Sequence, residues 1–227
     1  MLSTDQLHRL RATLDAAARR REAAELALAS KHKGGEWEEF DAAVEAELVA
    51  ERALAAGQDQ SYAVPVELSV LWDTGAPLPH LLQNDHRTFL IFFIRDSDPN
   101  WDGSYVSVRR PASSTSACQL AVVEFKGCLS TMMGSPNDEV LHGHPLYGKG
   151  LEGYRPMRVE NSAWLAEIQR INSVHNGYAP ERWHGLAHYF FGFHDSTFEC
   201  VAESLIVELY ESSLPEVLAK VCERLVR

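Results

Sequence analysis

The sequence predicts an α+β protein: an N-terminal antiparallel helical hairpin, followed by a mainly antiparallel β-sheet domain with a C-terminal helix. Two observations carry this prediction. Apolar residues recur at helical spacing up to residue 57, and from residue 62 onward alternating or continuous apolar runs follow one another directly. Strands that come in a run favour antiparallel pairing, because parallel strands need a long crossover, usually a helix, between them.

The predicted hairpin occupies residues 1–57. Residues 5–30 are expected to form one helix, because leucine and alanine fall on a seven-residue repeat broken only by Arg21. Residues 36–56 are expected to form a second helix with a single apolar stripe. The short Gly34–Gly35 connection favours two helices that lie side by side. Their apolar stripes must be buried, either against the chain's own β domain or against a second copy in a homo-oligomer.

Residues 62–227 form the predicted β-rich domain, which carries the expected site. Alternation over residues 64–72 is typical of a half-buried strand, and the continuous apolar run at 88–95 is typical of a central strand covered on both faces. Further strands are predicted in these segments: 104–109, 119–125, 129–133, 186–194 and 197–210. The last two are expected to form a hairpin that turns at Asp195–Ser196, since Asp and Ser are common in turns.

The remaining segments are a loop and two short helices. Residues 134–157 are rich in glycine and proline, which predicts a loop. Residues 162–174 are predicted to form an amphipathic helix, and residues 213–226 a second one capped by Ser213. The inward-facing residues expected on the first of these helices are Trp164, Leu165, Ile168 and Ile171.

Composition excludes several classes of function. The net charge of −11 argues against a nucleic-acid-binding protein, because phosphate binding needs clustered Lys and Arg. The longest uncharged apolar run, Phe89–Ile94, is too short to span a bilayer, and residues 1–15 lack the apolar core of a signal peptide. Four cysteines without a Cys-x-x-Cys pair fit a reducing cytoplasm. Alanine-rich helices and abundant arginine are typical of a GC-rich bacterial genome.

Three sequence patterns match known motifs only in part. Gly148–Gly153 matches the dinucleotide pattern G-x-G-x-x-G, but no strand precedes it and Pro156 follows it. His184 and His188 have the spacing of a zincin helix without its glutamate. The spacing of His142 and His144 resembles the paired histidines of cupins, yet the acid that should follow three or four residues later is missing. None of these patterns predicts a function.

Histidines are concentrated in one part of the sequence. Six of the ten lie between residues 142 and 194, accompanied by aromatic and acidic residues. Imidazole titrates near neutral pH and binds first-row metals, so such a concentration is typical of proton transfer or metal binding. The residues that we expect to bind a metal are His142, His144 and His194. The residues that we expect to be catalytic are His188, His194, Asp195 and Glu199.

We therefore expect an enzyme that acts on a small polar substrate through a histidine-rich pocket, with or without a divalent first-row metal as its cofactor. In this hypothesis an acidic residue orients an imidazole or binds the metal directly. Hydrolysis, isomerisation and metal-dependent oxidation all remain open as reaction classes. The alternative is a non-catalytic acidic interaction protein, of the inhibitor or immunity type, that covers a basic protein partner, since the net charge of −11 would steer it to such a surface.

Overall fold

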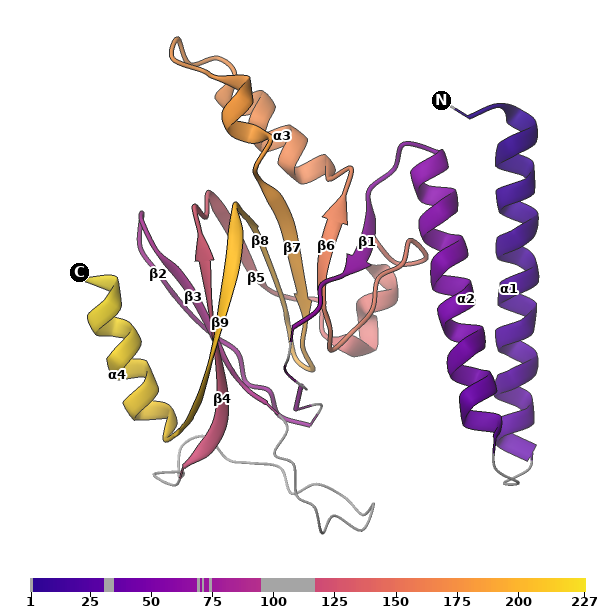
Figure 1. Cartoon of the computed structure of the whole chain (residues 1–227), viewed down its shortest axis with the longest axis horizontal. Helices are drawn as coiled ribbons and strands as arrows, with labels where there is room; N and C mark the ends of the chain where they lie inside the picture. Colours follow the sequence, from indigo (N-terminus) through magenta and orange to yellow (C-terminus); the bar gives the residue numbers. More distant parts are fainter. Residues whose placement is uncertain (1, 31–34, 69, 71, 74, 95–116) are drawn as a thin grey trace.

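The computed structural model of the chain describes residues 2–30, 35–68, 70, 72–73, 75–94 and 117–227. These residues form two antiparallel sheets with helices outside them, which confirms the α+β fold class (Figure 1). The four-stranded sheet has the order β2–β3–β4–β9, from β2 (His80–Gln83), β3 (Thr88–Phe93), β4 (Cys118–Lys126) and β9 (Ser204–Ser212). The five-stranded sheet has the order β1–β6–β7–β8–β5, from β1 (Tyr62–Pro65), β6 (Pro156–Glu160), β7 (Ala187–Gly192), β8 (Thr197–Ala202) and β5 (Ser130–Gly134).

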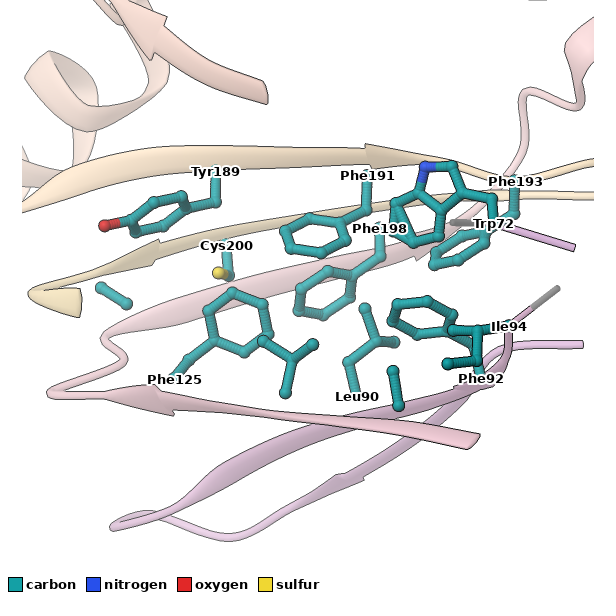
Figure 2. Packing of buried hydrophobic residues seen from close by; sticks show 13 residues of the cluster. Trp72, Leu90, Phe92, Ile94, Phe125, Tyr189, Phe191, Phe193, Phe198 and Cys200 are labelled. Carbon is teal, nitrogen blue, oxygen red and sulfur yellow. The ribbon is translucent and has the colours of Figure 1, made fainter. Parts of the chain in front are cut away.

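An aromatic core fills the space between the two sheets (Figure 2). Alternate residues of β7 and β8, such as Phe191 and Phe198, pack against side chains of the opposite sheet. The Phe125 and Phe198 ring centroids are 5.2 Å apart. Burial of each phenylalanine contributes about 1.5–3 kcal/mol. Because strand side chains alternate between faces, the intervening residues of β7 and β8 point to the outer face of the five-stranded sheet.

Strand β3 is buried on both faces, as its continuous apolar sequence predicts. One face joins the aromatic core, and the other packs against helix α4 (Leu214–Leu225) through Val217 and Val221. Helix α4 begins as predicted, because Ser213 and Glu216 form a reciprocal capping box at its N-terminus.

The chain crosses from one sheet to the other at two places: between the predicted strands 119–125 and 129–133, and within the segment 197–210, which was predicted as one continuous strand. Strand β4 leads into β5 at Gly127, and β8 leads into β9 at Glu203, whose amide donates to the Lys126 carbonyl over 2.9 Å. Gly127 has a φ of 59°, and a Cβ there would lie 2.6 Å from Cδ of Glu203. Glycine therefore permits both the left-handed backbone and the close approach of the two crossing chains.

Several other predictions need correction. Among the described residues of the predicted strand 64–72, only the first two belong to a regular strand, β1, although Trp72 is buried in the aromatic core and bridges Ile94. Strands β2 and β6 were not predicted, and the glycine-rich stretch before β6 contains the 3₁₀ helix η2 (Asp138–Gly143). Ile171 is exposed at the end of helix α3 (Ala163–Asn172), because only the first turns of α3 approach the sheet. A second 3₁₀ helix, η3, covers Pro180–Trp183. The predicted strand at 104–109 lies outside the described residues.

The N-terminal hairpin consists of α1 (Thr4–Ser30) and α2 (Glu36–Gly57), and it stands beside the β1 edge of the five-stranded sheet (Figure 1). Arg52 of α2 donates from Nε to the Ala63 carbonyl over 3.0 Å and pairs with the Glu152 carboxylate over 2.6 Å. Hairpin α1–α2 therefore contacts its own β domain through α2, whereas the homo-oligomer stays a prediction. Among the described residues, no helix is both long enough and apolar enough to span a bilayer.

Gly150 allows this contact, and its replacement tests how much the contact contributes. Gly150 has a φ of +81°, and a Cβ there would lie 2.5 Å from Arg52 Cγ and 2.7 Å from the Ala63 carbonyl oxygen. Gly148 has a similar φ of +70° but no atom within 4 Å of its Cβ position. We expect Gly148→Ala to cost about 1–2 kcal/mol for the left-handed backbone, and Gly150→Ala to cost about 2–4 kcal/mol because overpacking is added. Equal urea midpoints for the two variants would contradict this prediction.

Candidate functional site

The candidate site is a pocket on the outer face of the five-stranded sheet. It has a volume of about 1000 Å³ and lies between the start of α3, the α2–β1 connection and the segment 138–155. Its wall contains both apolar and polar side chains. The titratable and hydroxyl-bearing side chains that line it are Asp59, Ser61, His144, Lys149, Ser162, His188 and Glu199. The pocket therefore gathers acid, base and hydroxyl groups in a single cavity.

Glu199 joins two imidazoles in this pocket. Its Oε2 lies 2.8 Å from Nε2 of His188, and its Oε1 lies 3.4 Å from Nε2 of His144. The three side chains are largely buried, with exposed fractions of 5% for His188, 9% for His144 and 12% for Glu199. The Glu199 carboxylate is thus held between two buried imidazole rings, and it can accept a hydrogen bond from each of them.

Strand register explains why His188 and Glu199 meet. In the antiparallel β7–β8 pair, Phe190 faces Glu199 and His188 faces Val201. His188 and Glu199 are thus diagonal neighbours on the same face of the sheet, within reach of long side chains. The same register sends Tyr189 and Cys200 to the aromatic core, so the hairpin separates a polar outer site from an apolar interior.

The second ring nitrogen of His188 contacts a serine. Ser162 Oγ lies 2.8 Å from Nδ1 of His188, and this serine is the N-cap of α3, since its Oγ accepts the Leu165 amide over 3.0 Å. The indole of Trp164 lies edge to face with the His188 ring, with centroids 5.0 Å apart. These contacts fix the orientation of the imidazole from both sides.

His144 reaches the pocket from the segment 138–155. Its Nδ1 accepts the Leu146 amide over 3.3 Å, so in the neutral ring the proton lies on Nε2 and points to Glu199. Leu146 and Leu151 are buried against the outer face of the sheet together with Phe190. The apolar packing of the segment 138–155 thus positions His144 beside Glu199.

The environment of Glu199 keeps its carboxyl ionised. Burial alone would raise the pKa of Glu199, but the hydrogen bonds from His144 and His188 outweigh it and lower that pKa to about 2. At neutral pH the pocket therefore holds a fixed negative charge directly beside two imidazoles.

His194 belongs to a different cluster. Its Nδ1 lies 2.9 Å from Oδ2 of Asp138 and 3.0 Å from the Tyr154 hydroxyl, which itself donates to the same Asp138 carboxylate. The hydrogen bond to Asp138 is the main reason why the pKa of His194 is raised. The Asp138 amide also donates to the His194 carbonyl over 3.0 Å. This cluster fastens the segment 138–155 to the β7–β8 turn, and none of its residues lines the pocket described above.

The predicted site residues are thus only partly brought together. His188 and Glu199 meet in the pocket, whereas His194 and Asp195 lie at the β7–β8 turn. The three predicted metal ligands lie apart from one another. His142 is exposed beside the Tyr147 ring, with centroids 6.4 Å apart, whereas His144 contacts Glu199 and His194 contacts Asp138. Across the parts of the chain that the structure describes, no group of three or more His, Cys, Asp or Glu side chains is placed to hold a metal ion.

Sequence reasoning missed the serine and the aromatic ring that complete the surroundings of His188. Ser162 was predicted only as the first residue of the amphipathic helix 162–174, and its distance of 26 residues from His188 gave no sign of contact. The antiparallel β6–β7 pair, in which Val159 faces His188, brings the start of α3 to this imidazole. The His194 partners Asp138 and Tyr154 were missed for the same reason, because a long loop separates them from the β7–β8 turn.

Comparison with known protein families, with curated proteins and with solved structures gives no match to this chain. The candidate site therefore stands on its own geometry.

Proposed function

We propose that this protein is an enzyme that carries out acid–base chemistry on a small polar molecule bound in the pocket between α3 and the segment 138–155. The observation that carries the proposal is the Glu199 carboxylate held between His188 and His144. In this role His188 takes up and returns a proton, and Glu199 orients the ring and stabilises the imidazolium that forms. His144 serves as a second proton carrier on the same carboxylate.

The surroundings of the two imidazoles support catalysis. The His188 side chain is almost fully buried and lies against Trp164, so bulk water has little access to the proton that it exchanges. In such a site a fixed charge acts more strongly than in water. Buried histidines in a fold also form purely structural contacts, but these two converge with an ionised carboxylate on one cavity.

The size and lining of the pocket support a small substrate with both polar and apolar parts. A volume of about 1000 Å³ accommodates a metabolite-sized molecule. Gln60, Asn161 and Gln169 offer hydrogen-bonding amides, whereas Trp164 and Leu165 offer apolar contact. No disulfide forms among the cysteines that the structure describes, which fits a reducing compartment such as the cytoplasm.

A turnover screen with matched histidine variants tests the proposal. The purified full chain is incubated with a library of polar metabolites and activated esters, once with EDTA and once with Zn²⁺ or Mn²⁺, and consumption is followed by mass spectrometry. We expect a substrate whose turnover falls by about 100-fold or more in His188→Gln, since a general acid–base group contributes on that scale. His8→Gln is the control, because His8 is exposed on α1, away from the pocket.

Two outcomes separate the hypotheses. Turnover that depends on His188, with full activity in His8→Gln, supports an enzyme, and loss of that turnover in EDTA would add a metal to the proposal. Turnover that is equal in both variants, or absent throughout the library, counts against an enzyme and leaves the acidic interaction protein as the working hypothesis.

A further inference from the structure

Ser162, His188 and Glu199 form a continuous hydrogen-bonded relay in the pocket. Ser162 Oγ lies 2.8 Å from Nδ1 of His188, and Nε2 of His188 lies 2.8 Å from Oε2 of Glu199. We propose that Ser162 is a covalent nucleophile and that the pocket takes carboxylic esters. This inference rests on the proposed function, because it uses the same His188–Glu199 pair as its base, and it adds the reaction class and the substrate class.

The hydrogen bonds of the relay have the polarity that this chemistry needs. Glu199 is ionised and can only accept, so the neutral His188 ring carries its proton on Nε2 and presents a lone pair at Nδ1. Ser162 Oγ already accepts the Leu165 amide, which leaves its own hydroxyl proton to be donated to that lone pair. A nucleophile, a base and an orienting carboxylate are thereby connected in order.

Two further features favour negative charge in the pocket, one of them directly at Ser162. The Leu165 amide donates to Oγ over 3.0 Å, and this donor is fixed in place by the first turn of α3. The Lys149 ammonium lines the same pocket and forms no ion pair with any carboxylate that the structure describes. A fixed donor at Oγ and a cation on the pocket wall both favour an oxyanion over the neutral ground state.

The reaction follows from these contacts. Ser162 Oγ attacks the ester carbonyl carbon while His188 Nδ1 takes the hydroxyl proton. The carbon–oxygen bond to the alcohol breaks, and the alcohol leaves with the proton from His188, which gives an acyl-Ser162. A water molecule then attacks the acyl carbon, His188 takes a proton from that water, and Ser162 regains it as the acid leaves. The sum is ester plus water to acid plus alcohol, without an oxidant or reductant.

Labelling with a fluorophosphonate tests this inference on the full chain. Such a probe phosphonylates an activated serine irreversibly, so intact mass and peptide mapping report the site. We expect one label per chain on Ser162, and hydrolysis of p-nitrophenyl butyrate that falls by about 1000-fold or more in Ser162→Ala and Ser162→Asn. His188→Gln should abolish labelling although Ser162 is still present.

The variants separate chemistry from helix capping. Ser162→Asn keeps a side-chain oxygen for the Leu165 amide but removes the nucleophile, whereas Ser213→Ala removes the cap of α4 and leaves the pocket untouched. We expect Ser213→Ala to be labelled and active like the wild type. An unlabelled Ser162, or wild-type hydrolysis by Ser162→Asn, would overturn the inference. If another substrate still needs His188 but not Ser162, the proposed function stands and only the nucleophile is wrong.

Discussion

Replacing Glu124 with alanine is expected to destabilise the folded protein by about 3–5 kcal/mol, because it removes a buried carboxylate whose hydrogen bonds to charged partners contribute about 1.5–3 kcal/mol each. Glu124 lies on β4 and is 4% exposed. Its carboxylate accepts from Arg87 over 2.8 Å and from Arg224 of α4 over 2.7 Å, and it pairs with Lys126 over 2.7 Å. Burial alone would raise the pKa of Glu124, but the hydrogen bonds to Lys126 and Arg87 outweigh it and lower that pKa. The network connects the C-terminal helix to the four-stranded sheet.

A matched surface pair provides the control for this prediction. Glu167 and Arg170 form an ion pair over 2.7 Å on the exposed face of α3, where water replaces the lost contact. We expect Glu167→Ala to leave the urea midpoint nearly unchanged, while Glu124→Ala shifts it strongly. If the two variants unfold at the same urea concentration, the Glu124 network contributes no more than an ordinary surface pair, and the prediction is wrong.

Lowering the pH is expected to decrease the free energy of unfolding, because the Glu199 carboxylate becomes protonated. The folded-state pKa of Glu199 is about 2, against an ordinary value of 4.5. A carboxyl with a depressed pKa contributes stability that is fully present above its unfolded value and is lost as the pH falls toward its folded value. At about 1.4 kcal/mol per pH unit, this gap corresponds to about 3 kcal/mol, lost between about pH 4.5 and pH 2.

The measurement compares the wild type with Glu199→Gln, since other carboxyls titrate in the same range and cancel in the difference. Free energies of unfolding are obtained from urea titrations at pH 7, 5, 4 and 3. We expect the wild type to lose more stability than Glu199→Gln on going from pH 5 to pH 3. A difference between the two proteins that stays constant over this range would show that Glu199 is not held ionised by His144 and His188.

The same carboxylate links stability to the proposed chemistry. A Glu199 that is ionised at neutral pH accepts the Nε2 proton of His188, and this leaves Nδ1 free to act as a base toward Ser162. If the acid experiment fails, the orientation of His188 loses its physical support. The labelling of Ser162 should then be absent as well, so the two experiments check each other.

The local sequence pattern was sufficient to predict the elements in which the spacing of apolar residues alone shows which face is buried. The hairpin α1–α2 and the capped helix α4 follow from apolar spacing and from Ser213, and the doubly buried β3 follows from its continuous apolar run. The β7–β8 hairpin also forms where Asp195 and Ser196 predict a turn. In these segments local preference and tertiary packing favour the same structure.

Pattern failed where a long-range partner decides the structure. The crossing of β4 into β5 at Gly127 depends on the antiparallel course of β8 into β9 beside it, a contact between segments far apart in the sequence. Likewise, strand β6 forms within a glycine-rich stretch only because β1 and β7 lie on either side of it. Such pairings are specified by the whole sheet rather than by the propensity of the strand itself.

The same distinction between local pattern and long-range contacts applies to the residues of the candidate site. The sequence by itself determined that histidines concentrate before and within the β7–β8 hairpin, and it proposed His188 and Glu199, which the structure brings together in the candidate pocket. Only the tertiary structure decided that His144 reaches Glu199, that Ser162 reaches His188, and that His194 turns away to Asp138. The physical reason is that a side chain's partners across a fold depend on strand register and on how loops pack, and both are set by the burial of distant apolar residues.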